Sequence, residues 1–343
     1  FQSSDTIKCC IGVFAKYYNF EQLSADKKIK ELTVIDYAEV QFRGFIEGYY
    51  GNPWSLEDRI DLMKFGGEIK MNQYVFAPKD DPYHNSQWRD LYPTENLENI
   101  KKLAQAGNEN KCFFVYALHP FMNRAFNFNN YDADLKTVKA KYLQVIKSGV
   151  RQIALLEDDA TGSSAANLSR LLNDLTDWLT NLKNSGYPDL KTDILYCPND
   201  YMGNGSSAKL KGINASANRQ VHMVMTGNAI WGQVTANFAD NFYNNVASDG
   251  VAGRYPYMWV NWPCNDNYKT GLIMGGHNTI LHTRINGRKY EGIILNPMQH
   301  SEPSKVAIFT AADYCWKPWD AKEEGDQAWE DSFKYIDHVT ALE

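Results

Sequence analysis

The chain has 343 residues, of which 44% are hydrophobic, and 35 basic against 41 acidic residues give a net charge of -6. This length suffices for one large catalytic domain with appended segments, because a single α/β barrel occupies about 250 residues. With no basic stripe or arginine cluster, the charge pattern argues against a nucleic-acid partner. No apolar run approaches the roughly 20 residues of a membrane span, so we expect no membrane partner.

Cysteines and histidines show no metal-binding pattern. The cysteines form no C-x-x-C pair, and the histidines form neither H-x-H nor H-E-x-x-H. We therefore expect no metal, no cofactor and no disulfide framework, but buried free thiols. The cysteines concerned are Cys9, Cys10, Cys112, Cys197, Cys264 and Cys315.

The two ends of the chain differ in pattern from its middle. Residues 1–40 are predicted to be the C-terminal part of a preceding α/β domain, because Thr33–Val40 has the composition of a strand and follows a charged, helix-like segment. Residues 321–343 are predicted to begin a helical segment, with Trp329, Phe333 and Ile336 at helical spacing. The chain begins at Phe1 rather than at methionine and stops within this pattern, so we expect a fragment of a longer protein.

Residues 41–320 alternate short β-rich runs with helical or polar stretches, which predicts a parallel sheet with helices on its faces. Eight such units, with no G-x-G-x-x-G phosphate loop, favour a closed (β/α)8 TIM barrel over an open, doubly wound sheet. The eight runs are Arg43–Gly51, Met71–Pro78, Cys112–Pro120, Gln152–Asp159, Asp193–Asp200, Val221–Gly227, Tyr255–Pro263 and Tyr290–Met298.

Two of the intervening helices are legible in detail. Ser55 followed by Asp58 is typical of a capping box and predicts a helix that ends near Gly66. A second helix is indicated by apolar residues at helical spacing before Gly186, and we expect this stripe to be core packing. Its residues are Leu168, Leu171, Leu172, Leu175, Trp178, Leu179 and Leu182.

In a barrel enzyme the chemistry lies at the carboxyl ends of the strands, and there this sequence is rich in acids and amides. Such groups, with aromatic neighbours, suit a carbohydrate, although acids at strand ends are also ordinary helix caps and most aromatics are core. The polar residues at the strand ends are Lys79, Asp80, Asp81, Glu157, Asp158, Asp159, Asn199, Asp200, Tyr201, Asn261, Asn265, Asp266 and Asn296. The aromatic residues are Tyr49, Tyr50, Trp54, Trp88, Tyr201, Trp259 and Trp262.

Two acidic pairs are candidates for acid–base chemistry. Asp158 and Asp159 end a strongly apolar run, where like charges side by side are costly and would raise at least one pKa. Asp80 and Asp81 form the same dipeptide after another run, so the residues alone leave the choice between the pairs open, with metal binding as a third option.

Several motifs together carry a family resemblance. In chain order they are RGFIEGYYGNPWS, MNQYVFAPKDDPYH, WRDLYP, LLEDDA, CPNDY, MTG, WVNWPCND and ILNPMQHSE. Over residues 33 to 319 this set resembles glycoside hydrolase family 84, which contains β-N-acetylglucosaminidases, enzymes labelled hyaluronidases, and animal enzymes that remove O-linked N-acetylglucosamine from proteins. The resemblance implies a retaining hydrolase in which the substrate's own acetamido oxygen is the nucleophile, an exception to the two-carboxylate scheme.

The resemblance also assigns roles. Asp158 would orient and polarise the acetamido nitrogen, and Asp159 would be the general acid and then the base. Residues that would contact the sugar hydroxyls are Gly48, Lys79, Asp266 and Asn296; those that would surround the acetamido group or the scissile bond are Cys197, Tyr201, Thr226, Trp259 and Asn261. The implied substrate is a glycan or glycoconjugate with N-acetylglucosamine, and the implied compartment is extracellular, with the cytoplasm as the alternative. Nothing in the sequence indicates an oligomeric state.

The chain departs from the family pattern at a few positions. Ala160 follows the acidic pair where the family has isoleucine, Asn228 replaces a proline, and His119, Pro120 and Phe121 replace Ser-Pro-Gly. We expect none of these changes to touch the catalytic pair, and we expect those at His119 and Phe121 to alter leaving-group preference at the pocket mouth. Two other functions stay open: a catalytically silent glycan-binding barrel, against which both aspartates argue, and an endo-acting hyaluronan hydrolase.

Overall fold

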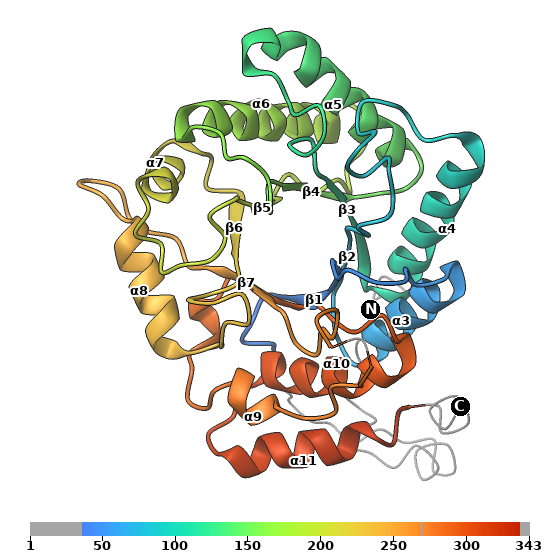
Figure 1. The fold of residues 1–343 in the computed structure, drawn as a ribbon, viewed down its shortest axis with the longest axis vertical. Coiled ribbons are helices and arrows are strands. Elements are labelled where there is room, and N and C mark those ends of the chain that lie inside the picture. Colours follow the sequence, from blue (N-terminus) through green and yellow to red (C-terminus); the bar gives the residue numbers. More distant parts are fainter. Residues whose placement is uncertain (1–35, 269, 337–343) are drawn as a thin grey trace, which may run out of the picture. The chain divides into compact units, whose positions relative to one another are not determined.

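The computed structural model describes residues 36–268 and 270–336, and its centre is a closed barrel of eight parallel strands (Figure 1). Each strand pairs with the next, and β8 pairs with β1 to close the barrel. The eight strands expected from the sequence are all present, and the predicted (β/α)8 TIM barrel is confirmed. They are β1 (Phe42–Glu47), β2 (Gln73–Phe76), β3 (Phe113–Leu118), β4 (Gln152–Leu156), β5 (Ile194–Cys197), β6 (Val221–Met225), β7 (Tyr257–Val260) and β8 (Gly292–Leu295).

Helices surround the barrel and cover the outer face of the sheet (Figure 1). They are α3 (Leu56–Glu68), α4 (Thr94–Asn110), α5 (Tyr131–Lys147), α6 (Ala165–Asn184), α7 (Ala208–Ser216), α8 (Ala236–Val246), α9 (His277–Ile280), α10 (Ser301–Trp316) and α11 (Lys322–Ser332), with short 3₁₀ turns at Phe128–Asn130 and Gly287–Lys289.

Local sequence explains where α3 begins and which face of α6 is buried. Ser55 and Asp58 form the expected capping box at the start of α3, each side chain accepting from the other residue's backbone N–H. In α6 the leucine stripe is buried, Leu172 completely, while Trp178 and Leu182 are partly buried against the same core. The predicted core-packing helix is confirmed.

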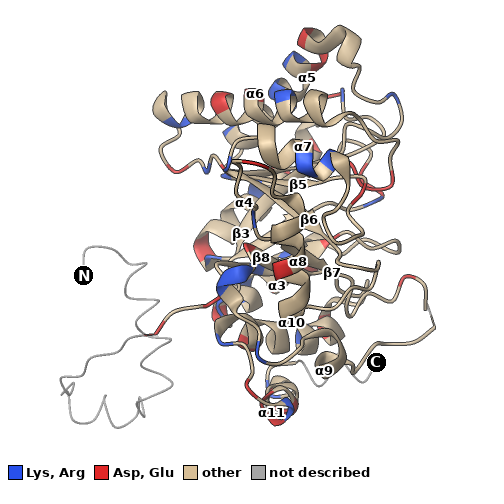
Figure 2. Cartoon of the chain, turned by 90° about the vertical axis from the view of Figure 1, so that its left-hand side faces the viewer, with Lys and Arg blue, Asp and Glu red and all other residues tan. Residues whose placement is uncertain are grey.

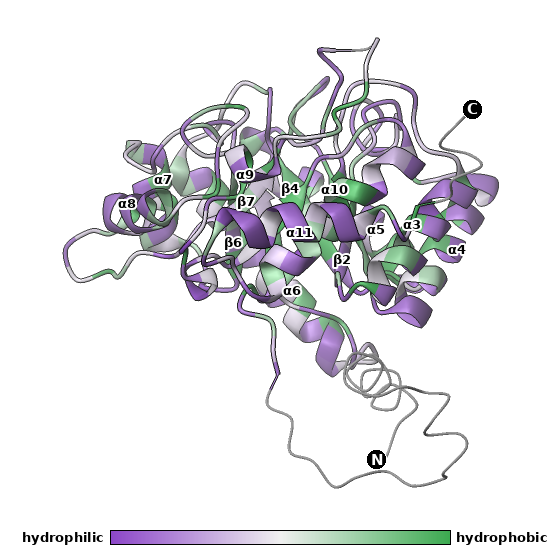
Figure 3. Cartoon of the chain, turned by 90° about the horizontal axis from the view of Figure 1, so that it is seen from below, coloured by the Kyte–Doolittle hydropathy of each residue, from purple (hydrophilic) through white to green (hydrophobic). Residues whose placement is uncertain are grey.

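The core has two layers. Alternate strand residues fill the inside of the barrel, among them Ile46, Val115 and Leu195, and the others pack outward beneath the helices. Helix α10 is buried over most of its length, because it lies against β1, β8, α3 and α11. Figure 3 shows the largely hydrophobic ribbon of α10 next to that of α11, which carries mostly hydrophilic residues.

The segments outside residues 41–320 differ from expectation in part. Of the strand expected at Thr33–Val40, residues 33–35 lie outside the described residues, and 36–40 form no strand. Instead the N–H groups of Glu39 and Val40 donate to the carbonyls of Trp316 and Cys315 at the end of α10. By its contacts the chain separates into Phe1–Tyr37 and Ala38–Glu343, and the assignment of residues 1–40 to a preceding domain stays a prediction.

At the other end, the helix expected after Trp319 is present as α11, which packs on α10. It ends at Ser332, so Phe333 and Ile336 lie in the turn that follows, where both still pack against the core.

The distribution of charged residues and the state of the cysteines agree with the expectations from the sequence, for the residues that the structure describes. Figure 2 shows basic and acidic residues interspersed over the helices and loops. The four cysteines within the described residues are buried free thiols, as expected, and Cys9 and Cys10 lie outside them. Among the described residues, the helices are all too short or too polar to cross a membrane.

Candidate active site

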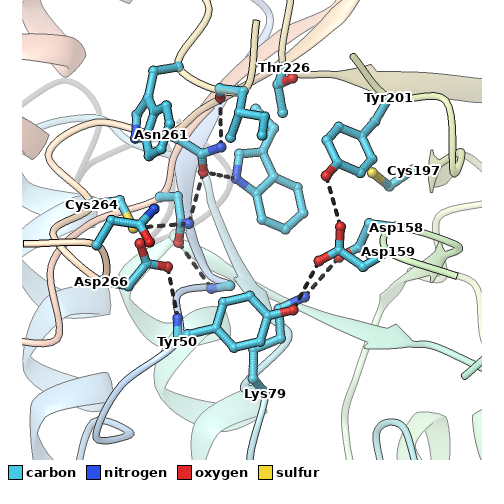
Figure 4. Close-up of a pocket in the computed structure, with 16 residues that line it drawn as sticks. Tyr50, Lys79, Asp158, Asp159, Cys197, Tyr201, Thr226, Asn261, Cys264 and Asp266 are labelled. Carbon is cyan, nitrogen blue, oxygen red and sulfur yellow. Dashed lines mark hydrogen bonds and ion pairs between the residues drawn. The ribbon is translucent and has the colours of Figure 1, made fainter. Parts of the chain in front are cut away.

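A cavity of about 440 Å³ opens at the carboxyl ends of the strands, and its walls bring together residues far apart in the sequence (Figure 4). All eleven site residues expected from the sequence line it: Gly48, Lys79, Asp158, Asp159, Cys197, Tyr201, Thr226, Trp259, Asn261, Asp266 and Asn296. Five further residues line it: Tyr50, which was expected only as one of the strand-end aromatics, and Ile230, Trp231, Cys264 and Asn267, which were not expected at the site. The volume is that of a small-molecule site.

Asp158 is the buried member of the acidic pair. Only 6% of the residue is exposed, and its Oδ2 accepts from Lys79 Nζ at 2.8 Å. Burial alone would raise the pKa of this carboxyl, but Lys79 and His119 outweigh burial and lower the pKa to about 2. The shift expected from like-charge repulsion is therefore reversed at Asp158, which is ionised at neutral pH.

The second oxygen of the Asp158 carboxylate is unused. Oδ1 is buried and accepts no hydrogen bond from the described residues, although His119 Nε2 lies 3.4 Å away. Leaving a buried anionic acceptor unpaired is costly, so an N–H donor on a ligand would be strongly favoured at this oxygen.

Asp159 lies in the opposite kind of environment. Its carboxylate is exposed at the cavity and accepts two tyrosine hydroxyls, from Tyr50 at 2.9 Å to Oδ2 and from Tyr201 at 2.8 Å to Oδ1 (Figure 4). Burial, with the hydrogen bond to Asp159, raises the pKa of both tyrosines, so both hydroxyls stay protonated and donate. Tyr201 therefore binds Asp159, whereas the family resemblance gave it the acetamido oxygen.

Three amide or indole groups join to form the opposite wall. Asn261 Oδ1 accepts from Trp259 Nε1 at 2.8 Å and from Asn296 Nδ2 at 3.0 Å, while Asn296 Oδ1 accepts the Gly48 N–H at 3.2 Å. A Cβ atom at Gly48 would lie 2.5 Å from the Trp259 ring, so this close approach requires glycine. The network fixes the amides and the indole before any ligand binds.

The rest of the wall is also held by local hydrogen bonds. Asp266 Oδ2 accepts the Tyr50 N–H at 3.1 Å, and Thr226 Oγ1 donates to the Ala229 carbonyl at 2.9 Å. Cys197 is buried, and burial raises the pKa of its thiol well above the ordinary value, so it acts as a wall rather than as a nucleophile.

The second acidic pair does not line the cavity. Asp81 is held in its own loop, where its carboxylate accepts from Tyr92 Oη at 2.6 Å and from the Tyr83 N–H at 2.8 Å, and Asp80 is exposed. From this segment it is Lys79 that reaches the cavity. The structure thus distinguishes two Asp-Asp pairs that their residues alone made equal candidates for acid–base chemistry, because only Asp158 and Asp159 line the cavity.

One expectation about the departures from the family pattern is wrong. His119 touches the acidic pair, because its Nε2 lies 2.6 Å from the Asp158 carbonyl oxygen. His119 and Phe121 are both buried and neither lines the cavity; Phe121 packs against Phe126 instead. These two residues therefore do not form the pocket mouth, which removes the basis for assigning leaving-group preference to them.

The lining residues to which no role was assigned differ in how strongly the sequence indicated them. Tyr50 stands two residues after Gly48, so its place at the end of β1 was a signal for a cavity residue. Ile230 and Trp231 lie on the loop after β6, where no strand pattern fixes side-chain direction. Within the described residues no cluster of three or more His, Cys, Asp or Glu side chains could hold a metal.

Comparisons with known proteins point to one family. A family model described as β-N-acetylglucosaminidase matches residues 43–343. The Protein O-GlcNAcase of Rattus norvegicus and that of Mus musculus are each 28% identical over 282 residues, which cover 79% of this chain but 29% of each relative. This chain therefore spans less than a third of the length of these relatives.

Solved structures share the architecture. The structure of CpGH84D has a TM-score of 0.78 and 41% sequence identity, covering 88% of this chain and 49% of that one. A mutant O-GlcNAc hydrolase of Thermobaculum terrenum, with a TM-score of 0.68, is 23% identical over 86% of this chain and 63% of its own, which shows a common fold. Because the family model covers the entire barrel, the chain belongs to the β-N-acetylglucosaminidase family, glycoside hydrolase family 84.

Proposed function

We propose that this domain releases β-linked N-acetylglucosamine from a glycan or glycoconjugate, with the acetamido oxygen of the substrate as nucleophile. The observation that carries the proposal is Asp158, a buried and ionised carboxylate that lines the cavity and whose Oδ1 accepts no hydrogen bond from the described residues. An acetamido group offers the matching N–H donor. A carboxylate that accepts this N–H increases the electron density on the amide oxygen, which is what a nucleophile at C1 requires.

Asp159 is suited to the complementary task. Its carboxyl group is exposed to the cavity next to Asp158 and is held by two hydroxyls, so it can exchange a proton with a group in the pocket. In the first step the acetamido oxygen bonds to C1, the bond from C1 to the leaving oxygen breaks, and Asp159 gives its proton to that oxygen. An oxazolinium ion remains, whose N–H is still donated to the Asp158 carboxylate, so that its positive charge lies beside that anion.

In the second step Asp159 takes a proton from water as the water oxygen bonds to C1 and the oxazoline ring opens. Two displacements at C1 retain the β configuration. Gly48, Lys79, Asp266 and Asn296 are proposed to bind the sugar hydroxyls, and Thr226, Trp259 and Cys197 to enclose the acetyl group, because all of them line the cavity. Tyr201 would exchange Asp159 for the acetamido oxygen, and Asn261 would lie near the scissile bond.

The substrate class is proposed at the level of the sugar. The names of the rat and mouse relatives make protein-linked N-acetylglucosamine one aglycone to test, with glycan-linked N-acetylglucosamine as the other. Export from the cell is a further prediction, and fractionation of the source cells for this protein would test it.

The test is to incubate the protein with an alkyl or aryl β-N-acetylglucosaminide and to follow the anomeric configuration of the released sugar by NMR. The β anomer of free N-acetylglucosamine should form first and then mutarotate. An α anomer as first product would exclude the double displacement, and binding without any turnover would support the silent glycan-binding barrel. Incubation with hyaluronan distinguishes endo action, since an endo enzyme would release oligosaccharides rather than the monosaccharide. A chelator should not change the rate.

A further inference from the structure

Behind the acidic pair lies a histidine that does not line the cavity. His119 follows β3, is 1% exposed, and has its Nε2 atom 2.6 Å from the Asp158 carbonyl oxygen. Its backbone N–H donates to the His84 carbonyl at 2.8 Å, and the two rings meet edge to face at 6.4 Å between centroids. The residue is therefore held by the loop after β2 as well as by the end of β3, which carries it.

The contact determines which ring nitrogen carries the proton. A carbonyl oxygen can only accept, so His119 Nε2 is the N–H donor. Nδ1 is buried, with no hydrogen-bond partner among the described residues. Within the described residues the ring thus makes one hydrogen bond, which ends on the backbone of the catalytic turn, and the same Nε2 lies 3.4 Å from Asp158 Oδ1.

The carbonyl that accepts this bond belongs to the peptide between the two aspartates. Residues Glu157 to Ala160 form a turn, in which the Ala160 N–H faces the Glu157 carbonyl at 3.4 Å. Asp159, the third residue of the turn, has φ of 56°, a left-handed conformation that turns of this kind usually assign to glycine or asparagine. Such a conformation persists only when its surroundings hold it.

Rotation of the central peptide is what would relieve this conformation. If that peptide turned over, Asp159 could return to negative φ, and the Cα–Cβ bonds of both aspartates would tilt, which would shift their carboxylates. The hydrogen bond from His119 is broken by the same rotation. One N–H outside the cavity therefore opposes the movement that would misplace both carboxylates.

We propose that His119 is a positioning residue, whose Nε2–H holds the Asp158–Asp159 peptide in the orientation that aims both carboxylates into the cavity. This inference rests on the proposed function and adds to it a residue that touches no substrate.

Three substitutions at this position test the proposal. In His119→Gln the side-chain amide can place an N–H close to the position of the histidine Nε2; in His119→Asn the amide is too short, and in His119→Ala the donor is absent. A displacement of about 1 Å at a catalytic group can cost about 10²-fold in rate. We expect kcat on an aryl β-N-acetylglucosaminide to fall about 10²-fold in the Ala and Asn variants and less than about tenfold in the Gln variant.

The pattern of the loss separates positioning from other roles. KM should change less than kcat in all variants, because the residues proposed to bind the sugar hydroxyls are untouched. The kcat loss in the Ala variant should persist with a good and with a poor aryl leaving group, because Asp158 is needed with both. A loss that vanished with the good leaving group would limit the effect to Asp159 and overturn the inference.

A matched control is Leu172→Ala on α6, a fully buried position in the helix layer. It should lower Tm through a cavity and leave kcat unchanged. Equal kcat in wild type and His119→Ala, or a folded His119→Gln as slow as His119→Ala, would refute the role of His119. If the Ala and Asn variants fail to fold, the Gln variant decides: near wild-type kcat supports the inference and a 10²-fold loss overturns it. An inactive wild type would refute the proposed function, and this inference with it.

Discussion

Two identical Asp-Asp dipeptides in this barrel differ in position, since one lines the cavity and the other does not. Asp158–Asp159 ends β4 and lies in the cavity, where one carboxylate is buried beside Lys79 and the other is exposed beside two tyrosines. Asp80–Asp81 follows β2 and turns away, with Asp81 bound within its own loop. The comparison shows that adjacent acids become a site when their two environments differ and both face one cavity, not when acids merely stand side by side.

The largest expected effect comes from removing either carboxylate of the cavity pair. Asp159→Asn should lower kcat about 10²- to 10⁴-fold with a poor leaving group and less with an activated aryl one, because an activated group needs little protonation. Asp158→Asn should lower kcat with both, since the nucleophile is affected. Steady-state kinetics on the two substrates measures this. Wild-type rates in both variants would refute the assignment.

A smaller effect is expected from Lys79→Met, which removes the charge that lowers the pKa of Asp158. The depressed pKa keeps Asp158 ionised down to about pH 2, so without Lys79 the carboxyl should protonate at higher pH. We expect the acidic limb of the kcat/KM profile to move upward in pH. If only KM rose and the limb stayed in place, Lys79 would act on the sugar alone.

Tyr50→Phe should have a moderate effect. Asp159 loses one of its two hydroxyl donors, and a hydrogen bond to a charged group is worth about 1.5 to 3 kcal/mol. Because Tyr50 is half exposed, water can supply part of the lost hydrogen-bond energy at Asp159. We therefore expect about a tenfold loss in kcat. Tyr201→Phe removes the donor to the other oxygen, and it should lower kcat more than Tyr50→Phe, because Tyr201 is also proposed to bind the acetamido oxygen. Wild-type kcat in Tyr50→Phe would show that its hydroxyl does not hold the acid.

The smallest effects are expected at the other dipeptide. Asp81→Asn disturbs the hydrogen bonds from Tyr92 and Tyr83 and should cost about 1 to 3 kcal/mol of unfolding free energy. The exposed Asp80→Asn should change stability by less than about 0.5 kcal/mol. Thermal melts and kinetics measure both. A loss of kcat in Asp80→Asn comparable to that in Asp158→Asn would remove the distinction between the pairs.

The sequence predicted the fold well because barrel strands carry local signals. Each was a short apolar run closed by polar residues, and the capping box and the leucine stripe placed two helices. Thr33–Val40 shows the limit of such signals: its composition suits a strand, but Glu39 and Val40 bond to the end of α10. Strand composition does not reveal which backbone partner is within reach.

The site could be predicted residue by residue from motifs, but its internal contacts could not. Nothing in the sequence indicated that Tyr201 would bind Asp159, or that His119 would reach the Asp158 carbonyl. Both contacts depend on the direction of loop side chains, which only tertiary packing determines. The direction of the Asp158 pKa shift was missed for the same reason, because Lys79 comes from another strand end.

The pairing of β1 with β8 has a consequence for synthesis and for truncation. The free edge of Phe42–Glu47 has no partner until Gly292–Leu295 is available, so some 250 residues must emerge from the ribosome before the ring of strands can close. Until then both edges are templates for pairing with other chains. Any shortened version that ends before residue 295 should therefore aggregate rather than yield a smaller working domain.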